Sequence, residues 1–280
     1  MRVLLTGATG YIGRRLKQKL IEDENVELVL FVRNKKALSQ YARDNLRIIQ
    51  GDTFDKDALQ EAMQGVDVAY YLIHSLSSKD YKDLDRRSAQ NFSDIADDCG
   101  VERIIYLGGL GVISDHTSQH LLSRLETGEV LSQNKAVQTV WIRAGVIIGS
   151  GSASFEIIRS LVEKLPVMTT PKWVDTKAQP IAVDDVLAYL HESLYLTETE
   201  NLTVDIGSEA MTYKQMMVET AHALGLKRYL LPVPYMSINI SSYWLNIFTP
   251  VPFTVAKALV EGLRSEVVVQ NDNARRYFAG

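Results

Sequence analysis

Short apolar runs alternate with segments of helical periodicity along the first half of the chain. The apolar runs predict strands at residues 3–6, 26–32, 46–50, 66–72, 104–107 and 137–142. Between them, Ile12, Leu16 and Leu20 share one helical face, and a longer helix carries Tyr81, Leu84, Phe92, Ile95 and Cys99 on one face. Apolar strands that alternate with helices are typical of a parallel sheet covered on both sides. The pattern predicts an α/β fold with a doubly wound parallel sheet, which binds ligands at the carboxyl ends of its strands.

The regular alternation fades after Ala144, where the sequence continues as GVIIGSGSASF. We expect a loop over the site here, followed by a smaller region. Helices are predicted at 154–164 and 183–194, a strand at 202–206, and a helix from an N-cap at Thr212 to Leu224. The sequence thus predicts a dinucleotide-binding domain at 1–150 and a smaller α/β substrate or lid region at 151–280.

A glycine pattern lies where the first strand gives way to the first helix. Residues 3–16 read VLLTGATGYIGRRL. Glycines here permit a tight turn, close approach of a pyrophosphate and close packing of helix on strand, while the helix N-terminus offers free amides. This context indicates a Rossmann-type nucleotide site rather than three simple turns. The residues expected to contact the cofactor are Gly7, Thr9, Gly10, Tyr11, Ile12 and Gly13.

The end of the second strand carries Arg33 and Asn34, where an acidic residue would bind the ribose of NAD(H). A guanidinium can instead pair with a 2′-phosphate, and Lys35 and Lys36 add positive charge. NADP(H) is therefore the preferred cofactor, and NAD(H) remains possible. The alternative is an arginine that simply faces solvent at a strand end.

The ends of the next strands supply further candidate contacts. Gly51 precedes Asp52 and Thr53, and we expect a carboxylate there to accept a hydrogen bond from the adenine amino group, the alternative being a plain turn. The residues expected to flank the nicotinamide ribose are Leu72, Ile73 and His74 after the fourth strand, and Leu107, Gly108 and Gly109 after the fifth.

Composition and charge narrow the class of protein. The 30 basic and 34 acidic residues leave a formal charge of −4. The chain therefore has no long-range positive electrostatic field that would attract nucleic acid or an anionic membrane. Cys99 is the only cysteine, so no intrachain disulfide forms. With no signal peptide recognisable at its start, the chain is expected to be cytoplasmic.

The apolar stretch from Leu230 to Phe253 contains four prolines and is not expected to span a membrane. Core and lid packing is the favoured interpretation of this stretch. A site for a lipid-like substrate and a weak peripheral membrane contact are the alternatives.

These motifs together resemble an atypical member of the short-chain dehydrogenase/reductase superfamily, in its NmrA-like, YbjT-like group. The resemblance covers nearly the whole chain. The strings that carry it include TGATGYIG at 6–13, VRN at 32–34, GD at 51–52, YYLIHSL at 70–76, NF at 91–92, IIYLGGLG at 104–111, IRAGVIIGSGSASFE at 142–156, QPIAVDDV at 179–186 and NLTVDIGSEAMTYKQM at 201–216.

Catalytic members of this superfamily carry a Tyr and a Lys four residues apart on the helix after the fifth strand, with a Ser at that strand's end. This chain has His120 and Arg124 at that spacing, and Gly108 or Gly109 in place of the Ser. Residues four apart on a helix share a face. His120 is thus a candidate proton donor, Arg124 a candidate contact to the nicotinamide ribose or a substrate oxygen, and His74 a second proton donor. The alternatives are a solvated helix face, a cofactor contact without chemistry, and packing of His74 against the cofactor.

Four later residues have weaker signals. Trp173 and Gln179 are candidates for a substrate pocket, although a packed aromatic ring and a turn amide are favoured. Asp184 and Asp185 open a helix, and we expect them to cap it or to interact with its dipole rather than to do acid–base work.

Three functions agree with these observations. The first is an NADP(H)-dependent oxidoreductase acting on an unidentified small carbonyl, alkene or quinone-like substrate. The second is a non-catalytic NADP(H)-sensing regulator with a protein partner, which the missing Tyr and Lys favour. The third, a nucleotide-sugar epimerase, ranks last because such enzymes normally need that same Tyr.

Overall fold

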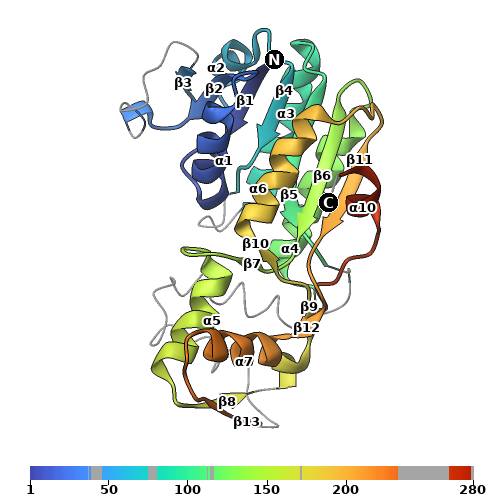
Figure 1. Cartoon of the computed structure of the whole chain (residues 1–280). Coiled ribbons are helices and arrows are strands. Elements are labelled where there is room, and N and C mark those ends of the chain that lie inside the picture. Colours follow the sequence, from blue (N-terminus) through green and yellow to red (C-terminus); the bar gives the residue numbers. More distant parts are fainter. Residues whose placement is uncertain are drawn as a thin grey trace.

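A parallel sheet of seven strands forms the centre of the larger region, in the order β11-β6-β5-β4-β1-β2-β3 (Figure 1). The structure is a computed structural model that describes residues 1–36, 38, 46–74, 81–111, 113, 117–170, 172–232 and 265–278. The strands are β1 (Arg2–Thr6), β2 (Glu27–Val32), β3 (Leu46–Gln50), β4 (Val68–Tyr71), β5 (Arg103–Gly109), β6 (Gln138–Ala144) and β11 (Leu202–Ile206). The predicted doubly wound α/β sheet is confirmed, since every predicted strand is present within a few residues of its expected bounds.

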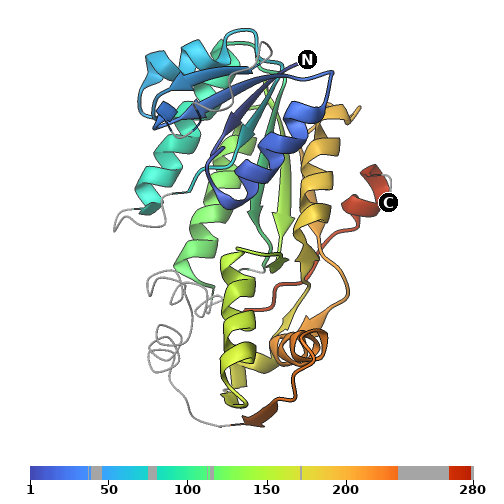
Figure 2. The same cartoon turned by 60° about the vertical axis from the view of Figure 1, so that its left-hand side comes forward.

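Helices cover both faces of this sheet (Figures 1 and 2). On one face, α1 (Tyr11–Glu22) and α6 (Val183–Glu192) pack through residues such as Leu16 and Val186. The other face is covered by α2 (Lys56–Met63), α3 (Tyr81–Asp98) and α4 (Gln119–Gln133). Alternation along β4 sends Tyr70 into the first layer and Tyr71 into the second, and both rings are fully buried. Two cores thus hold the strand ends in fixed positions.

The smaller region lies beyond the carboxyl ends of the sheet strands (Figure 1). Its helices are α5 (Ala153–Lys164), η2 (Lys172–Asp175) and α7 (Tyr213–Ala223). Its short strand pairs are β7 (Ile147–Ile148) with β10 (Ile181–Ala182), β9 (Lys177–Ala178) with β12 (Met211–Thr212), and β8 (Val167–Thr170) with β13 (Tyr229–Pro232). Thr212 caps α7 in a capping box with Gln215, which confirms the predicted helix start.

The chain returns from the smaller region to the large sheet. After β10 it forms α6 and η3 (Ser193–Tyr195), and then β11 joins the sheet beside β6, with Val204 opposite Ile142. Segment 265–278 contains α10 (Asn273–Tyr277), which packs against β11. Segments from beyond residue 150 therefore complete the larger sheet, and the division at that residue stays a prediction.

Within the described parts of the chain, no helix combines the length and the apolar character needed to span a bilayer. The apolar stretch singled out in the sequence falls mostly outside the described residues, which stop at Pro232 and resume at Ser265.

Candidate functional site

The turn between β1 and α1 requires glycine at two positions. Gly7 has a φ of +70°, and a β-carbon there would lie 2.2 Å from the carbonyl oxygen of Leu72, the residue after β4. A β-carbon on Gly13 would lie 2.1 Å from the carbonyl oxygen of Gly7. Any side chain at either position would push the helix away from the sheet. The sequence thus forces a tight turn that brings the start of α1 against the strand ends.

The start of α1 carries no competing anion. Gly10 is the N-cap and makes no side-chain cap, and the first turn contains no acidic residue. Its backbone amides and the positive end of the helix dipole are therefore available to an anionic ligand. Tyr11 and Ile12 pack partly against the core, and the guanidinium of Arg15 lies 4.1 Å from the centroid of the Tyr11 ring. Burial raises the pKa of the Tyr11 hydroxyl.

A cleft of about 410 Å³ opens in front of this turn. It is bounded by the turn itself, by the ends of β2, β3 and β4, and by α3. The predicted residues that line it are Gly7, Thr9, Gly10, Arg33, Asp52, Thr53, Leu72, Ile73 and His74. Gly51, Leu84 and Ser88 line it as well, with Ala8, Phe31, Val32 and Phe54. Tyr11, Ile12 and Gly13 belong to the first turn of α1 and lie outside this lining.

Arg33 is exposed at the end of β2 and lines the cleft. None of the carboxylates that the structure describes forms an ion pair with its guanidinium. The turn that follows is held by two side chains, since Asn34 accepts from the Lys36 amide at 3.0 Å and Gln50 accepts from the Lys35 amide at 3.2 Å. These two hydrogen bonds fix the backbone after β2, and the guanidinium of Arg33 beside it is accessible to a ligand.

The turn after β3 is fixed by its own side chains. Asp52 accepts from the Phe54 amide at 3.1 Å, and Asn91 donates to the Thr53 carbonyl oxygen at 3.1 Å. The buried Thr53 hydroxyl accepts from Ser88 at 2.7 Å. These bonds tie the turn to α3 and hold Asp52 at the cleft.

Two imidazoles and a guanidinium meet at the ends of β4 and β5. The rings of His74 and His120 are 6.4 Å apart between centroids, and Arg124 donates to the Leu107 carbonyl oxygen at 2.8 Å. Burial and the positive charge of Arg124 lower the pKa of His120 to about 4. Burial, Arg124 and His120 lower the pKa of His74 well below its usual value. The structure thus brings the three catalytic candidates together, with both imidazoles neutral at neutral pH.

The glycines at the end of β5 serve the packing of the sheet. A β-carbon on Gly108 would lie 2.3 Å from the Trp141 indole nitrogen, and one on Gly109 would lie 2.8 Å from a Leu121 methyl carbon. The space that a β-carbon on either glycine would take is therefore filled by Trp141 and Leu121. That packing seats α4, with His120 and Arg124, closely on β5.

The later candidates have mostly structural surroundings. The Gln179 side chain donates to the Ser208 carbonyl oxygen at 2.6 Å and accepts from the Val269 amide at 2.5 Å, so both ends of its amide hold turns together. Trp173 lies in η2, and its side chain is outside the described part of the structure. Asp184 and Asp185 lie in the first turn of α6, where they interact favourably with the helix dipole.

The first half of the chain matches a known family model. The model is described as NAD(P)H-binding and matches residues 7–146, half of the chain. The chain belongs to the NAD(P)H-binding family. All the residues of this NAD(P)H-binding protein that line the cleft fall within the matched segment. The resemblance to the atypical, NmrA-like group of short-chain dehydrogenases/reductases is confirmed.

Similar proteins are reductases and epimerases by name. A (4-alkanoyl-5-oxo-2,5-dihydrofuran-3-yl)methyl phosphate reductase of Streptomyces griseus is 22% identical over 92% of this chain and 85% of its own length. The triphenylmethane reductase of Citrobacter sp., solved with NADP(H), superposes with a TM-score of 0.77 at 20% identity, covering 99% of this chain and 95% of that one. A nucleoside-diphosphate-sugar epimerase of Staphylococcus aureus superposes with a TM-score of 0.78 at 16% identity over the same shares of the two chains. At these identities, the structural likenesses establish the fold alone.

Proposed function

We propose that this chain is an NADPH-dependent reductase that passes a hydride to a small carbonyl, alkene or quinone-like acceptor. The observation that carries the choice of cofactor is Arg33, which lines the cleft and pairs with none of the described carboxylates. A planar guanidinium can bind a 2′-phosphate with two parallel hydrogen bonds, whereas NADH offers only a hydroxyl there.

The shape of the cleft supports this assignment. A β-carbon on Gly7 or Gly13 would meet backbone carbonyl oxygens, so glycine at these positions keeps the turn tight where a pyrophosphate has to approach the backbone. In this proposal Gly7, Thr9 and Gly10 hold the pyrophosphate, together with the first turn of α1 from Tyr11 to Gly13. Arg33, Asn34 and Lys35 hold the 2′-phosphate, and Asp52 and Thr53 bind the adenine. The nicotinamide ribose lies against Leu72, Ile73, His74 and the end of β5 at Leu107, Gly108 and Gly109, with Arg124 beside it.

When bound, the nicotinamide supplies the hydride, and the chain supplies orientation and polarity. His120 and His74 are neutral at neutral pH because burial and Arg124 lower the pKa of each. Their role is therefore to donate an N–H hydrogen bond to the acceptor oxygen rather than to deliver a proton from an imidazolium. The proton that completes the reduction is taken from solvent. Arg124, anchored on the Leu107 carbonyl oxygen, adds a fixed positive charge beside that oxygen.

The named relatives support a reductase. The Streptomyces griseus relative is a reductase, and the Citrobacter sp. structure combines reductase activity in its name with NADP(H) in its site. A second candidate is a non-catalytic NADP(H) sensor with a protein partner. It is favoured by the presence of His120 and Arg124 where catalytic relatives carry Tyr and Lys.

A turnover assay separates the two candidates. Purified protein is mixed with NADPH and a panel of quinones, enones and aldehydes, and the loss of nicotinamide absorbance is followed. We expect oxidation with at least one acceptor class, and a rate about 100-fold lower in His120→Ala or His74→Ala, since each removes one donor to the developing oxyanion. Gln119→Ala, an exposed neighbour on α4, is the matched control and should keep the wild-type rate. Tight binding of NADPH without oxidation by any acceptor would instead support the sensor.

A further inference from the structure

The cleft has an exposed aromatic wall that the sequence motifs do not explain. Phe54 is 41% exposed and lines the cleft directly after Asp52 and Thr53. Its backbone is fixed because its amide donates to the Asp52 carboxylate at 3.1 Å. Ligand clefts are lined largely by apolar and aromatic side chains, so this ring at the edge of the cleft is a candidate contact surface.

A cation backs this ring. The guanidinium carbon of Arg87, on α3, lies 5.3 Å from the centroid of the Phe54 ring. Asp83, one turn earlier on the same helix, restrains that guanidinium through an ion pair at 3.6 Å. A cation over an aromatic face is attracted by the electron density of the ring. Arg87 thus restricts Phe54 from one side while the ring lines the cleft.

The rest of this wall comes from the same helix. Leu84 and Ser88 line the cleft beside Phe54, and Ser88 is bonded to Thr53 at 2.7 Å. Helix α3 and the turn at 52–54 therefore form one continuous wall with an apolar and an aromatic surface. Such a surface suits the flat face of a nucleobase, since base–aromatic stacking needs no hydrogen-bond partner.

We propose that Phe54 is the platform on which the adenine base of the cofactor stacks, and that Arg87 is a positioning residue that holds the ring for it. This inference rests on the proposed function, because it assumes that the adenosine half of NADPH occupies this end of the cleft. It adds an aromatic stack to the phosphate contact of Arg33, so that base and 2′-phosphate are recognised by separate side chains.

The test compares ligands with and without adenine. Binding of NADPH and of reduced nicotinamide mononucleotide is measured by calorimetry for the wild type, Phe54→Leu and Phe54→Tyr. We expect Phe54→Leu to weaken NADPH about 10- to 100-fold and to leave the mononucleotide unchanged, because the lost stack involves only the base. Phe54→Tyr keeps the ring and should bind NADPH within about threefold of the wild type.

Arg87 is tested against its neighbour. Arg87→Gln should weaken NADPH several-fold, whereas Arg86→Gln, which also removes a positive charge that pairs with Asp83, should not. Equal NADPH affinity in Phe54→Leu and the wild type would overturn the stacking inference while leaving the proposed function intact. Equal losses for NADPH and the mononucleotide in Phe54→Leu would also overturn it. A wild type that binds no NADPH would overturn both.

Discussion

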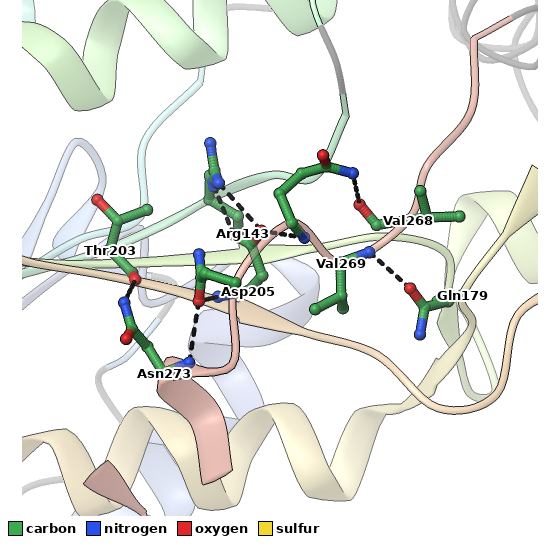
Figure 3. Close-up of polar contacts among 9 residues, drawn as sticks. Arg143, Gln179, Thr203, Asp205, Val268, Val269 and Asn273 are labelled. Carbon is green, nitrogen blue, oxygen red and sulfur yellow. Dashed lines mark hydrogen bonds and ion pairs between the residues drawn. The ribbon is translucent and has the colours of Figure 1, made fainter. Parts of the chain in front are cut away.

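The guanidinium of Arg143 on β6 donates to both carboxylate oxygens of Asp205 on the neighbouring strand β11, at 2.6 and 3.0 Å. The Asp205 side chain is completely buried, and it also accepts from the Gln270 amide at 2.8 Å. Asn273 donates to the Thr203 carbonyl oxygen at 2.8 Å close by (Figure 3). Two charged side chains on adjacent strands thus anchor the C-terminal segment on the edge of the large sheet.

Asp205→Ala is expected to lower the free energy of unfolding by about 3–5 kcal/mol, because it leaves the partly buried Arg143 without its counter-charge. Chemical denaturation measures this loss. Glu27→Ala, which breaks the exposed Arg2–Glu27 pair, is the control and should cost less than about 1 kcal/mol. Similar losses in the two variants would show that Asp205 does not have the structural role assigned to it.

Local patterns in the sequence predicted most of the large sheet. Within the predicted strands 26–32 and 137–142, residues 28–32 and 140–142 are apolar throughout, and the structure buries them between two helical layers. The pairing of β11 with β6 could not be predicted, because partners in a parallel sheet are chosen by tertiary packing after a long crossover. For this reason the return of the chain from the smaller region to the large sheet was missed.

The candidate site was predicted unevenly for a similar reason. Short motifs at strand ends predicted the glycine turn, Arg33 and residues 51–53. All of these residues line the cleft except Gly13, which lies inside α1. Phe54 and Ser88 were missed as cleft residues, because an aromatic in a turn and a serine in a helix carry no motif of their own. Trp141 on β6 packs against Gly108 on β5 and Gly128 on α4. This packing joins three elements, and no local sequence pattern encodes it.

Gly13→Ala is expected to destabilise the fold by about 2–3 kcal/mol. The added β-carbon would meet the Gly7 carbonyl oxygen at 2.1 Å, and the only relief is a shift of α1 away from β1. Thermal and chemical unfolding without ligand measure this cost. A Gly13→Ala protein as stable as the wild type would contradict the close packing of helix and strand described above.

Gly10→Ala should separate binding from stability. An added β-carbon would lie 3.3 Å from the Gly7 carbonyl oxygen, and the backbone φ of −73° at Gly10 is one that alanine adopts easily. We expect unfolding within about 0.5 kcal/mol of the wild type but weakened NADPH binding, since the new methyl group lies where a pyrophosphate approaches. Unchanged affinity in this variant would argue against the pyrophosphate site at α1.

His120 is expected to make the fold sensitive to mild acid. Its pKa is about 4 in the folded chain, where burial and Arg124 disfavour the charged ring, whereas an unfolded histidine titrates near a pH of about 6.5. The unfolded chain therefore binds more protons between these values, and the free energy of unfolding falls as the pH drops through this window. His120→Gln should flatten that fall, measured by denaturation at several pH values. Arg124→Met should raise the pKa of His120, as followed by NMR, because it removes the positive charge that disfavours the charged ring. An unchanged pKa would contradict this electrostatic interaction.

In the proposed function, the cleft in front of the β1–α1 turn binds NADPH and Arg33 recognises its 2′-phosphate. The most direct measurement is a calorimetric titration of the wild type, Arg33→Asp and Arg275→Asp with NADPH and NADH. Arg275→Asp makes the same charge reversal on the exposed α10, against the opposite edge of the sheet. We predict that the wild type binds NADPH more tightly than NADH and that Arg33→Asp alone weakens NADPH about 10- to 100-fold with little effect on NADH. Equal losses for the two nucleotides in Arg33→Asp, or no binding of either by the folded wild type, would contradict the account.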